Sequence, residues 1–202
     1  MVLNLALEGT VFQHGGRRHY NYSSPKYREL CGRVVEKMAE RYGSHPAVIG
    51  WQIDNEFNCE ISVFYSEADH RAFCEWLKRR YGSLDELNRV WGTVFWNQTY
   101  TDWEQVHLLR PTVSDSPNPH QAIDEKRFIS GNTISFAQLQ ADIIRKHASA
   151  NQWITTNGLF GHLDSHELAD RVLDFFLTTR IHNSRRFLLL LRKSRLRTGV
   201  GV

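Results

Sequence analysis

The sequence predicts an α/β fold with parallel strands, and three observations support this prediction. Predicted helices alternate with short apolar strands, in the order helix, strand, helix, strand, helix, strand. No glycine-rich phosphate loop follows any predicted strand, which argues against a doubly wound nucleotide-binding fold. Hydrophobic residues make up 41% of the 202 residues, so the chain can supply a substantial core.

The first predicted helix begins at Pro25. Ser24 is a typical N-cap residue, and proline suits the first helical position that follows it. Apolar residues then recur at helical spacing as far as Tyr42, and Gly43 ends the pattern. We therefore expect an amphipathic helix over residues 25–42.

A short apolar run over residues 47–53 follows a His-Pro pair that breaks the helical pattern. Such a run is typical of a buried parallel strand. A polar cluster falls at the C-terminal end of this predicted strand, namely Asp54, Asn55 and Glu56.

Two further helices are predicted from their N-terminal caps. Ser66 and Asp69 have the spacing of a capping box, which predicts a helix that ends near Tyr81. Ser83 and Glu86 have the same spacing, so another capping box and a short helix through Val90 are expected.

The second half of the chain repeats the alternation. Residues 93–119 show no clear period, and we interpret them as a long surface excursion. A helix is then expected from Thr133 to His147 and a buried strand over 153–157. A short helix over 165–171 and the beginning of another strand over 172–176 complete the pattern.

The net charge of +3 comes from the end of the chain. Seven of the 25 basic residues follow Phe176, and no acidic residue accompanies them. The preceding chain therefore has 22 acidic against 18 basic residues, as a soluble enzyme often has. We expect no nucleic acid partner.

Neither export nor a membrane is indicated. No stretch approaches the roughly 18 apolar residues that span a bilayer, and the N-terminus lacks the features of a signal peptide. The three cysteines, Cys31, Cys59 and Cys74, form no C-x-x-C pair, so neither a disulfide framework nor a zinc module is indicated. We expect reduced thiols and a cytoplasmic protein.

Glu56 is the first candidate for chemistry. Catalytic groups of parallel α/β barrels lie at the C-terminal ends of strands, where the predicted strand puts this residue. Partial desolvation beside Phe57 would favour the acid form that a general acid needs. A structural carboxylate that caps the following loop fits the same position, and the residues alone leave both readings open.

A longer string is more specific than these single residues. The sequence WQIDNEF over residues 51–57 is preceded by RRHY at 17–20 and SSP at 23–25, and is followed by WGTVFW at 91–96. Together these strings closely resemble the glycoside hydrolase family 42 β-galactosidases. The resemblance extends from about Gly9 to about Phe176.

The resemblance implies roles for four residues. Glu56 would be the general acid/base, Asn55 would bind the sugar near its 2-hydroxyl, and Arg17 would line the galactose subsite. Trp96 resembles an aromatic residue at the rim of the site, sometimes supplied by a neighbouring subunit, and core or interface packing is the other reading. No cofactor is expected.

The resemblance implies no nucleophile in this chain, because the family's nucleophile is a glutamate at the end of the seventh barrel strand. A retaining glycosidase needs two carboxylates, and one cannot perform both tasks. We expect Glu60, Glu67 and Glu167 to be surface carboxylates.

Several weaker candidates remain. Asn157 either shapes the site or bonds the backbone of its own loop, whereas structural roles are expected for His14 and His19. Some family members bind zinc through several cysteines, but this chain has Asn21 at the first such place and only Cys59 afterwards. We therefore expect no metal.

The resemblance implies a partial (β/α)8 TIM barrel, from the end of the third βα unit to the start of the sixth strand. Residues 1–176 would be a piece of the catalytic domain. Residues 177–202 would be a basic, non-native tail that arose from a frameshift or a mistaken boundary.

The expected function of the parent enzyme is hydrolysis of terminal β-D-galactose from β-galactoside oligosaccharides with retention. The parent would be a homotrimer, and the 202-residue chain would be inactive. The alternative is a non-catalytic barrel remnant with at most weak sugar binding, which a second strand-end carboxylate would exclude.

Overall fold

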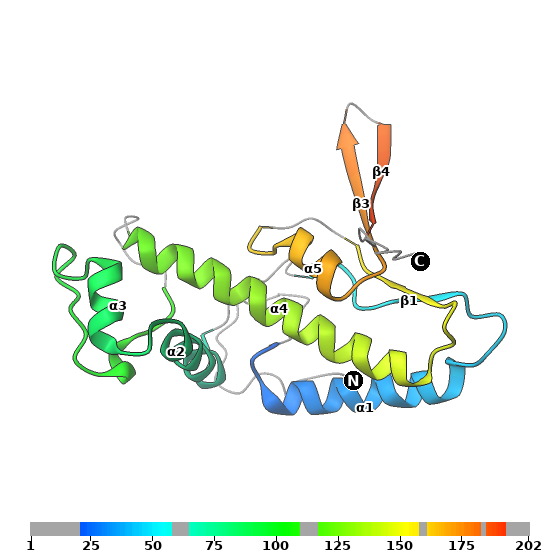
Figure 1. Ribbon diagram of the computed structural model, residues 1–202, viewed down its shortest axis with the longest axis horizontal. Helices are drawn as coiled ribbons and strands as arrows, with labels where there is room; N and C mark the ends of the chain where they lie inside the picture. Colours follow the sequence, from blue (N-terminus) through cyan, green and yellow to red (C-terminus); the bar gives the residue numbers. More distant parts are fainter. Residues whose placement is uncertain (1–20, 58–64, 110–116, 158–160, 183–184, 193–202) are drawn as a thin grey trace, which may run out of the picture. The chain divides into compact units, whose positions relative to one another are not determined.

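The computed structural model of the chain describes residues 21–57, 65–109, 117–157, 161–182 and 185–192, and Figure 1 shows its elements. The helices in these ranges are α1 (Pro25–Tyr42), α2 (Glu67–Tyr81), α3 (Leu84–Trp91), α4 (Pro119–His147) and α5 (Ser165–Arg171), with a 3-10 turn η2 (Trp103–Gln105). The strands are β1 (Gly50–Gln52), β2 (Trp153–Thr155), β3 (Phe175–His182) and β4 (Arg185–Arg192).

The chain divides into two compact units. The first contains residues 1–30 and 60–133, and the second contains residues 31–59 and 134–202. Helices α1 and α4 each contribute residues to both units.

The core of the first unit lies between α2, α3, the segment after η2 and the first half of α4. Eight buried apolar side chains form it: Phe73, Leu77, Leu87, Trp91, Val106, Leu108, Phe128 and Ile129. The predicted starts of α2 and α3 are confirmed, because the Ser66 side chain accepts from the Asp69 amide and the Ser83 side chain accepts from the Glu86 amide.

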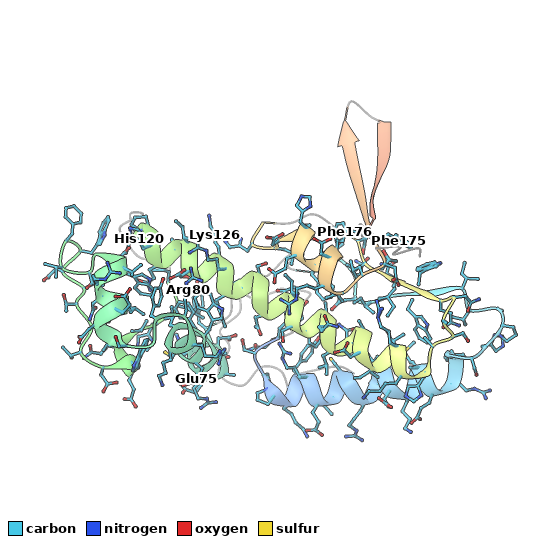
Figure 2. The ribbon with its side chains drawn as sticks, in the orientation of Figure 1. Glu75, Arg80, His120, Lys126, Phe175 and Phe176 are labelled. Carbon is cyan, nitrogen blue, oxygen red and sulfur yellow. The ribbon has the colours of Figure 1, made fainter. Side chains whose placement is uncertain are left out.

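A buried carboxylate joins the helices of the first unit. The side chain of Asp124 on α4 is 1% exposed, and it accepts hydrogen bonds from Trp91 Nε1 at 2.9 Å and from the Tyr81 hydroxyl. Arg127 pairs with it at 2.9 Å and Arg80, labelled on α2 in Figure 2, at 3.4 Å. Two cations and two neutral donors thus compensate for the burial of this charge.

The second unit contains the parallel strand pair that the sequence predicts. Strands β1 and β2 pair in parallel, with Gly50 opposite Trp153 and Gln52 opposite Thr155. Glycine is required at the start of β1, because a Cβ atom there would lie 2.1 Å from the Trp153 ring.

The C-terminal ends of α1 and α4 lie side by side, where each helix leads toward its strand (Figure 1). His147 Nε2 lies 2.7 Å from Glu36 Oε1, and the Ser149 amide donates to the Gly43 carbonyl at 3.0 Å. The connection from α1 to β1 and the connection from α4 to β2 therefore begin next to each other.

The chain after α5 continues the sheet edge of β2. The Ile154 amide donates to Asp174 Oδ2 at 2.8 Å, and Thr155 Oγ1 donates to the Phe175 carbonyl at 2.7 Å. Figure 2 labels Phe175 and Phe176 at the beginning of β3, which pairs antiparallel with β4. The prediction of a non-native tail concerns residues 177–202, of which 183–184 and 193–202 lie outside the described residues, and it stays a prediction.

Within the described ranges, none of the helices combines the length and the apolar character that crossing a membrane requires.

Candidate functional site

The candidate site is built on the chain that follows β1. Ile53 is buried, and its amide donates to the Thr155 carbonyl of the neighbouring strand at 2.9 Å. Beyond this last cross-strand bond the backbone turns sharply, with φ of 50° at Asp54 and 55° at Glu56. Non-glycine residues rarely adopt positive φ, so the predicted acid/base residue lies in a strained turn at a strand end.

Asn157 joins this turn to the end of β2. Its Oδ1 accepts a hydrogen bond from Gln52 Nε2 at 3.0 Å and another from the Glu56 amide at 3.3 Å. The sequence left two roles open for Asn157, shaping the site or bonding the backbone of its own loop. In the structure its side chain accepts from Gln52 at the end of β1 and from the backbone amide of Glu56.

Asn55 and Gln52 belong to the same network. Gln52 Nε2 lies 3.5 Å from Asn55 Oδ1, at the outer limit of a hydrogen bond, and the Asn55 amide donates to Asp54 Oδ1 at 2.7 Å. Asn55 is exposed and Glu56 is half-buried. Gln52 is a site residue that the sequence motifs do not single out, although a polar side chain at the last position of a strand could have indicated a role.

The two aromatic residues of the WQIDNEF string have different surroundings. Phe57 is 1% exposed, so it anchors the turn in the interior directly after Glu56. The Trp51 indole donates to Gln152 Oε1 at 2.9 Å, and Gln152 directly precedes β2. Trp51 is therefore bound at the start of β2, and Glu56 is bound beyond its end.

The other predicted sugar-binding residues are described only in part. Arg17 lies outside the described residues, as do His14 and His19. Trp96 is half-buried in the turn after α3, and its ring lies edge-on to that of Phe95, with 5.2 Å between centroids. Phe95 itself is 84% exposed.

Two of the remaining carboxylates form ion pairs on helix surfaces. Glu67 pairs with Arg71 along α2 at 3.3 Å, and Glu167 pairs with Arg171 along α5 at 2.6 Å. Exposed pairs of this kind agree with the expectation of surface carboxylates. Glu60 lies outside the described residues.

Asn21 has a structural role at the start of α2. It is buried, and its Nδ2 donates to Ser66 Oγ at 2.8 Å and to Asp69 Oδ2 at 3.0 Å. Both acceptors belong to the capping box of α2, so Asn21 stabilises the first turn of that helix. Cys59, the other residue considered for zinc, lies outside the described residues.

No group of three or more His, Cys, Asp or Glu side chains arranged to hold a metal ion occurs among the described residues.

Comparison with known proteins gives a consistent result. The model of glycoside hydrolase family 42, described as β-galactosidase, matches residues 2–186. The chain is 45% identical over 177 residues to the β-galactosidase BgaA of a Thermus species, and the match covers 86% of this chain and 27% of the relative. A β-galactosidase of Thermus thermophilus is 44% identical, with the same coverage.

Solved structures agree with the sequence matches. The β-galactosidase of the psychrophilic Marinomonas ef1 has a TM-score of 0.77 at 40% identity, and the match covers 84% of this chain and 26% of that one. The β-galactosidase of the haloarchaeon Halorubrum lacusprofundi has a TM-score of 0.78 at 36% identity, with coverage of 86% and 26%. The chain thus spans about a quarter of the length of the relatives it matches.

Proposed function

The chain belongs to glycoside hydrolase family 42, and from this premise we propose that it supplies the acid/base part of a retaining β-galactosidase active site. The observation that carries the proposal is the position of Glu56 in a turn beyond a parallel strand, bound to the end of the next strand through Asn157. Family membership and strand-end position support the same residue.

Glu56 would act twice in the reaction. In the first step its protonated carboxyl donates a proton to the glycosidic oxygen as that oxygen leaves the anomeric carbon and a second carboxylate attacks from the opposite face. In the second step the Glu56 carboxylate takes a proton from water, which attacks the anomeric carbon and releases the second carboxylate. The second carboxylate would come from a part of the enzyme outside this chain, and the chain alone would not turn over a galactoside.

Other residues would bind the substrate. Asn55, adjacent to Glu56 and exposed, would bond a hydroxyl of the galactose ring. Arg17 and Trp96 would complete the sugar subsite, as the family resemblance implies. The preferred substrate would be an oligosaccharide with terminal β-linked galactose.

The proposal includes the architecture of the whole enzyme. The family resemblance implies that β1 and β2 would be the fourth and fifth strands of a (β/α)8 barrel, and both end in polar residues at the same edge, as catalytic strands of such barrels do. The whole enzyme would be a cytoplasmic homotrimer.

The test needs a complete enzyme. In this enzyme, which we call the exchange enzyme, the matched segment of this chain replaces the corresponding segment of the Thermus BgaA β-galactosidase. We expect Glu56→Ala to reduce kcat by about 100-fold or more on a galactoside with a poor leaving group, which requires protonation. The loss in the rate of the glycosylation step should be much smaller on a dinitrophenyl galactoside, because the dinitrophenolate leaving group departs with little protonation.

Glu167→Ala is the matched control, since Glu167 is paired on the surface of α5. It should leave both rates unchanged. Equal losses on both substrates in Glu56→Ala would show that Glu56 is not the proton donor.

A further inference from the structure

Asn157 contacts both the strand end and the turn that carries Glu56. One oxygen atom, Oδ1, accepts from the Gln52 side chain at 3.0 Å and from the Glu56 amide at 3.3 Å. A carbonyl oxygen has two lone pairs, so these two donors use its full accepting capacity. Asn157 therefore connects the residue that ends β1 with the backbone of Glu56.

The turn needs such a contact because its backbone is strained. Asp54 and Glu56 both have positive φ, which costs on the order of 1 kcal/mol or more for each non-glycine residue. A strained conformation persists only where its surroundings hold it. Buried Phe57 fixes the chain on one side of Glu56, and Asn157 binds the amide of Glu56 itself.

The Glu56 amide determines which end of the Asn157 side chain faces the turn. A backbone N–H can only donate, so the Asn157 oxygen is the atom that meets it, and Gln52 Nε2 donates to the same oxygen. With the amide reversed, Nδ2 would oppose two donors.

We propose that Asn157 is a positioning residue that holds the backbone of Glu56 in its left-handed conformation. This inference rests on the proposed function of Glu56. A small displacement of a catalytic group can cost about 100-fold in rate, so loss of the contact should impair proton transfer selectively.

The contact can be tested on the 202-residue chain by amide hydrogen exchange. The Glu56 amide should be protected in the wild-type chain and in Asn157→Asp, which keeps an oxygen acceptor, and should exchange faster in Asn157→Ala. The control is Asn151→Ala, at an exposed position before β2. Unchanged protection in Asn157→Ala would overturn the proposal.

The consequence for catalysis is tested in the exchange enzyme. Asn157→Ala should lower kcat by about 10-fold to 100-fold on a galactoside with a poor leaving group, and by clearly less in the glycosylation of dinitrophenyl galactoside. Asn157→Asp should restore the wild-type ratio of the two rates. A structural role would reduce both rates equally, and that result, or an Asp variant that behaves as Ala does, would overturn the proposal.

Glu56→Ala, measured beside these variants, separates the two claims. If it discriminates between leaving groups and Asn157→Ala does not, the positioning role falls and the acid/base role stands. If Glu56→Ala itself fails to discriminate, both fall.

Discussion

At the scale of single residues, Glu56 depends both on the strand that precedes it and on a side chain that is distant in the sequence. Its position after a strand follows from the apolar run and the polar cluster behind it. Its positive φ and its bond to Asn157 depend on a partner about a hundred residues away, which no local pattern reveals. Gln52 has a local signal, a polar side chain at the last position of β1, but its partner Asn157 is equally distant in the sequence.

Glu125 is a second carboxyl group that the sequence did not single out. It is 7% exposed on α4, and its Oε2 accepts from the Leu109 amide at 3.0 Å. Burial raises the pKa of Glu125 to about 7, against a smaller lowering by the Leu109 bond. The folded state therefore binds this proton more tightly than the unfolded state does.

This raised pKa predicts a pH dependence of stability. The tighter proton binding by Glu125 stabilises the folded state fully below pH 4.5, which is the pKa of this group in the unfolded chain. This stabilisation is lost as the pH rises through about 7, and the loss lowers the free energy of unfolding by up to about 3 kcal/mol. In Glu125→Gln, which keeps an acceptor for Leu109, this loss should be absent. Urea unfolding of both proteins across this pH range measures it, and identical pH profiles would contradict the assignment.

At the scale of elements, local signals predicted helices better than strands. The capping box at Ser66 is confirmed, and of the one predicted at Ser83 the N-cap bond to the Glu86 amide is confirmed, because a cap acts within one helical turn. Helix α4 begins at Pro119, well before the predicted start at Thr133. The signal was present, since the Asn118 side chain accepts from the His120 amide just before that start, but the irregular residues before it concealed it.

Strands β1 and β2 are shorter than predicted, because a strand extends only as far as its backbone hydrogen bonds to a neighbouring strand. Only residues 50–52 of the predicted 47–53 form β1, opposite 153–155. Strand β3 begins at Phe175 and continues to His182, because its antiparallel partner β4 lies in the part assigned to the tail. A pairing partner is long-range information, which apolar runs do not carry.

The surroundings of two glycines, one in β1 and one in α4, predict opposite effects of substitution on stability. Gly50→Ala should lower the free energy of unfolding by about 1–3 kcal/mol, because its Cβ would meet the rigid Trp153 ring. Gly131→Ala, in α4 with nothing within 4 Å of the new Cβ, should raise it by about 0.5–1 kcal/mol. Thermal unfolding of both variants checks this, and equal shifts of the same sign would contradict the observed packing of Gly50.

At the scale of the whole molecule, the chain forms two compact units and spans about a quarter of its relatives. Alternation of helices and strands predicted the parallel pairing, and the strings around Glu56 predicted the family. The placement of Arg17 and the nature of residues 177–202 stay predictions, because they concern residues that are undescribed or described only in part. The central claim is that this chain contributes one of two catalytic carboxylates.

The anomer formed on azide rescue of Glu56→Ala in the exchange enzyme tests that claim most directly. Dinitrophenyl galactoside should still form the glycosyl-enzyme, and azide should attack it from the face that Glu56 leaves open, so that β-galactosyl azide accumulates. If Glu56 were the nucleophile, azide would attack the substrate directly from the opposite face. Formation of α-galactosyl azide, or no azide adduct at all, would contradict the account.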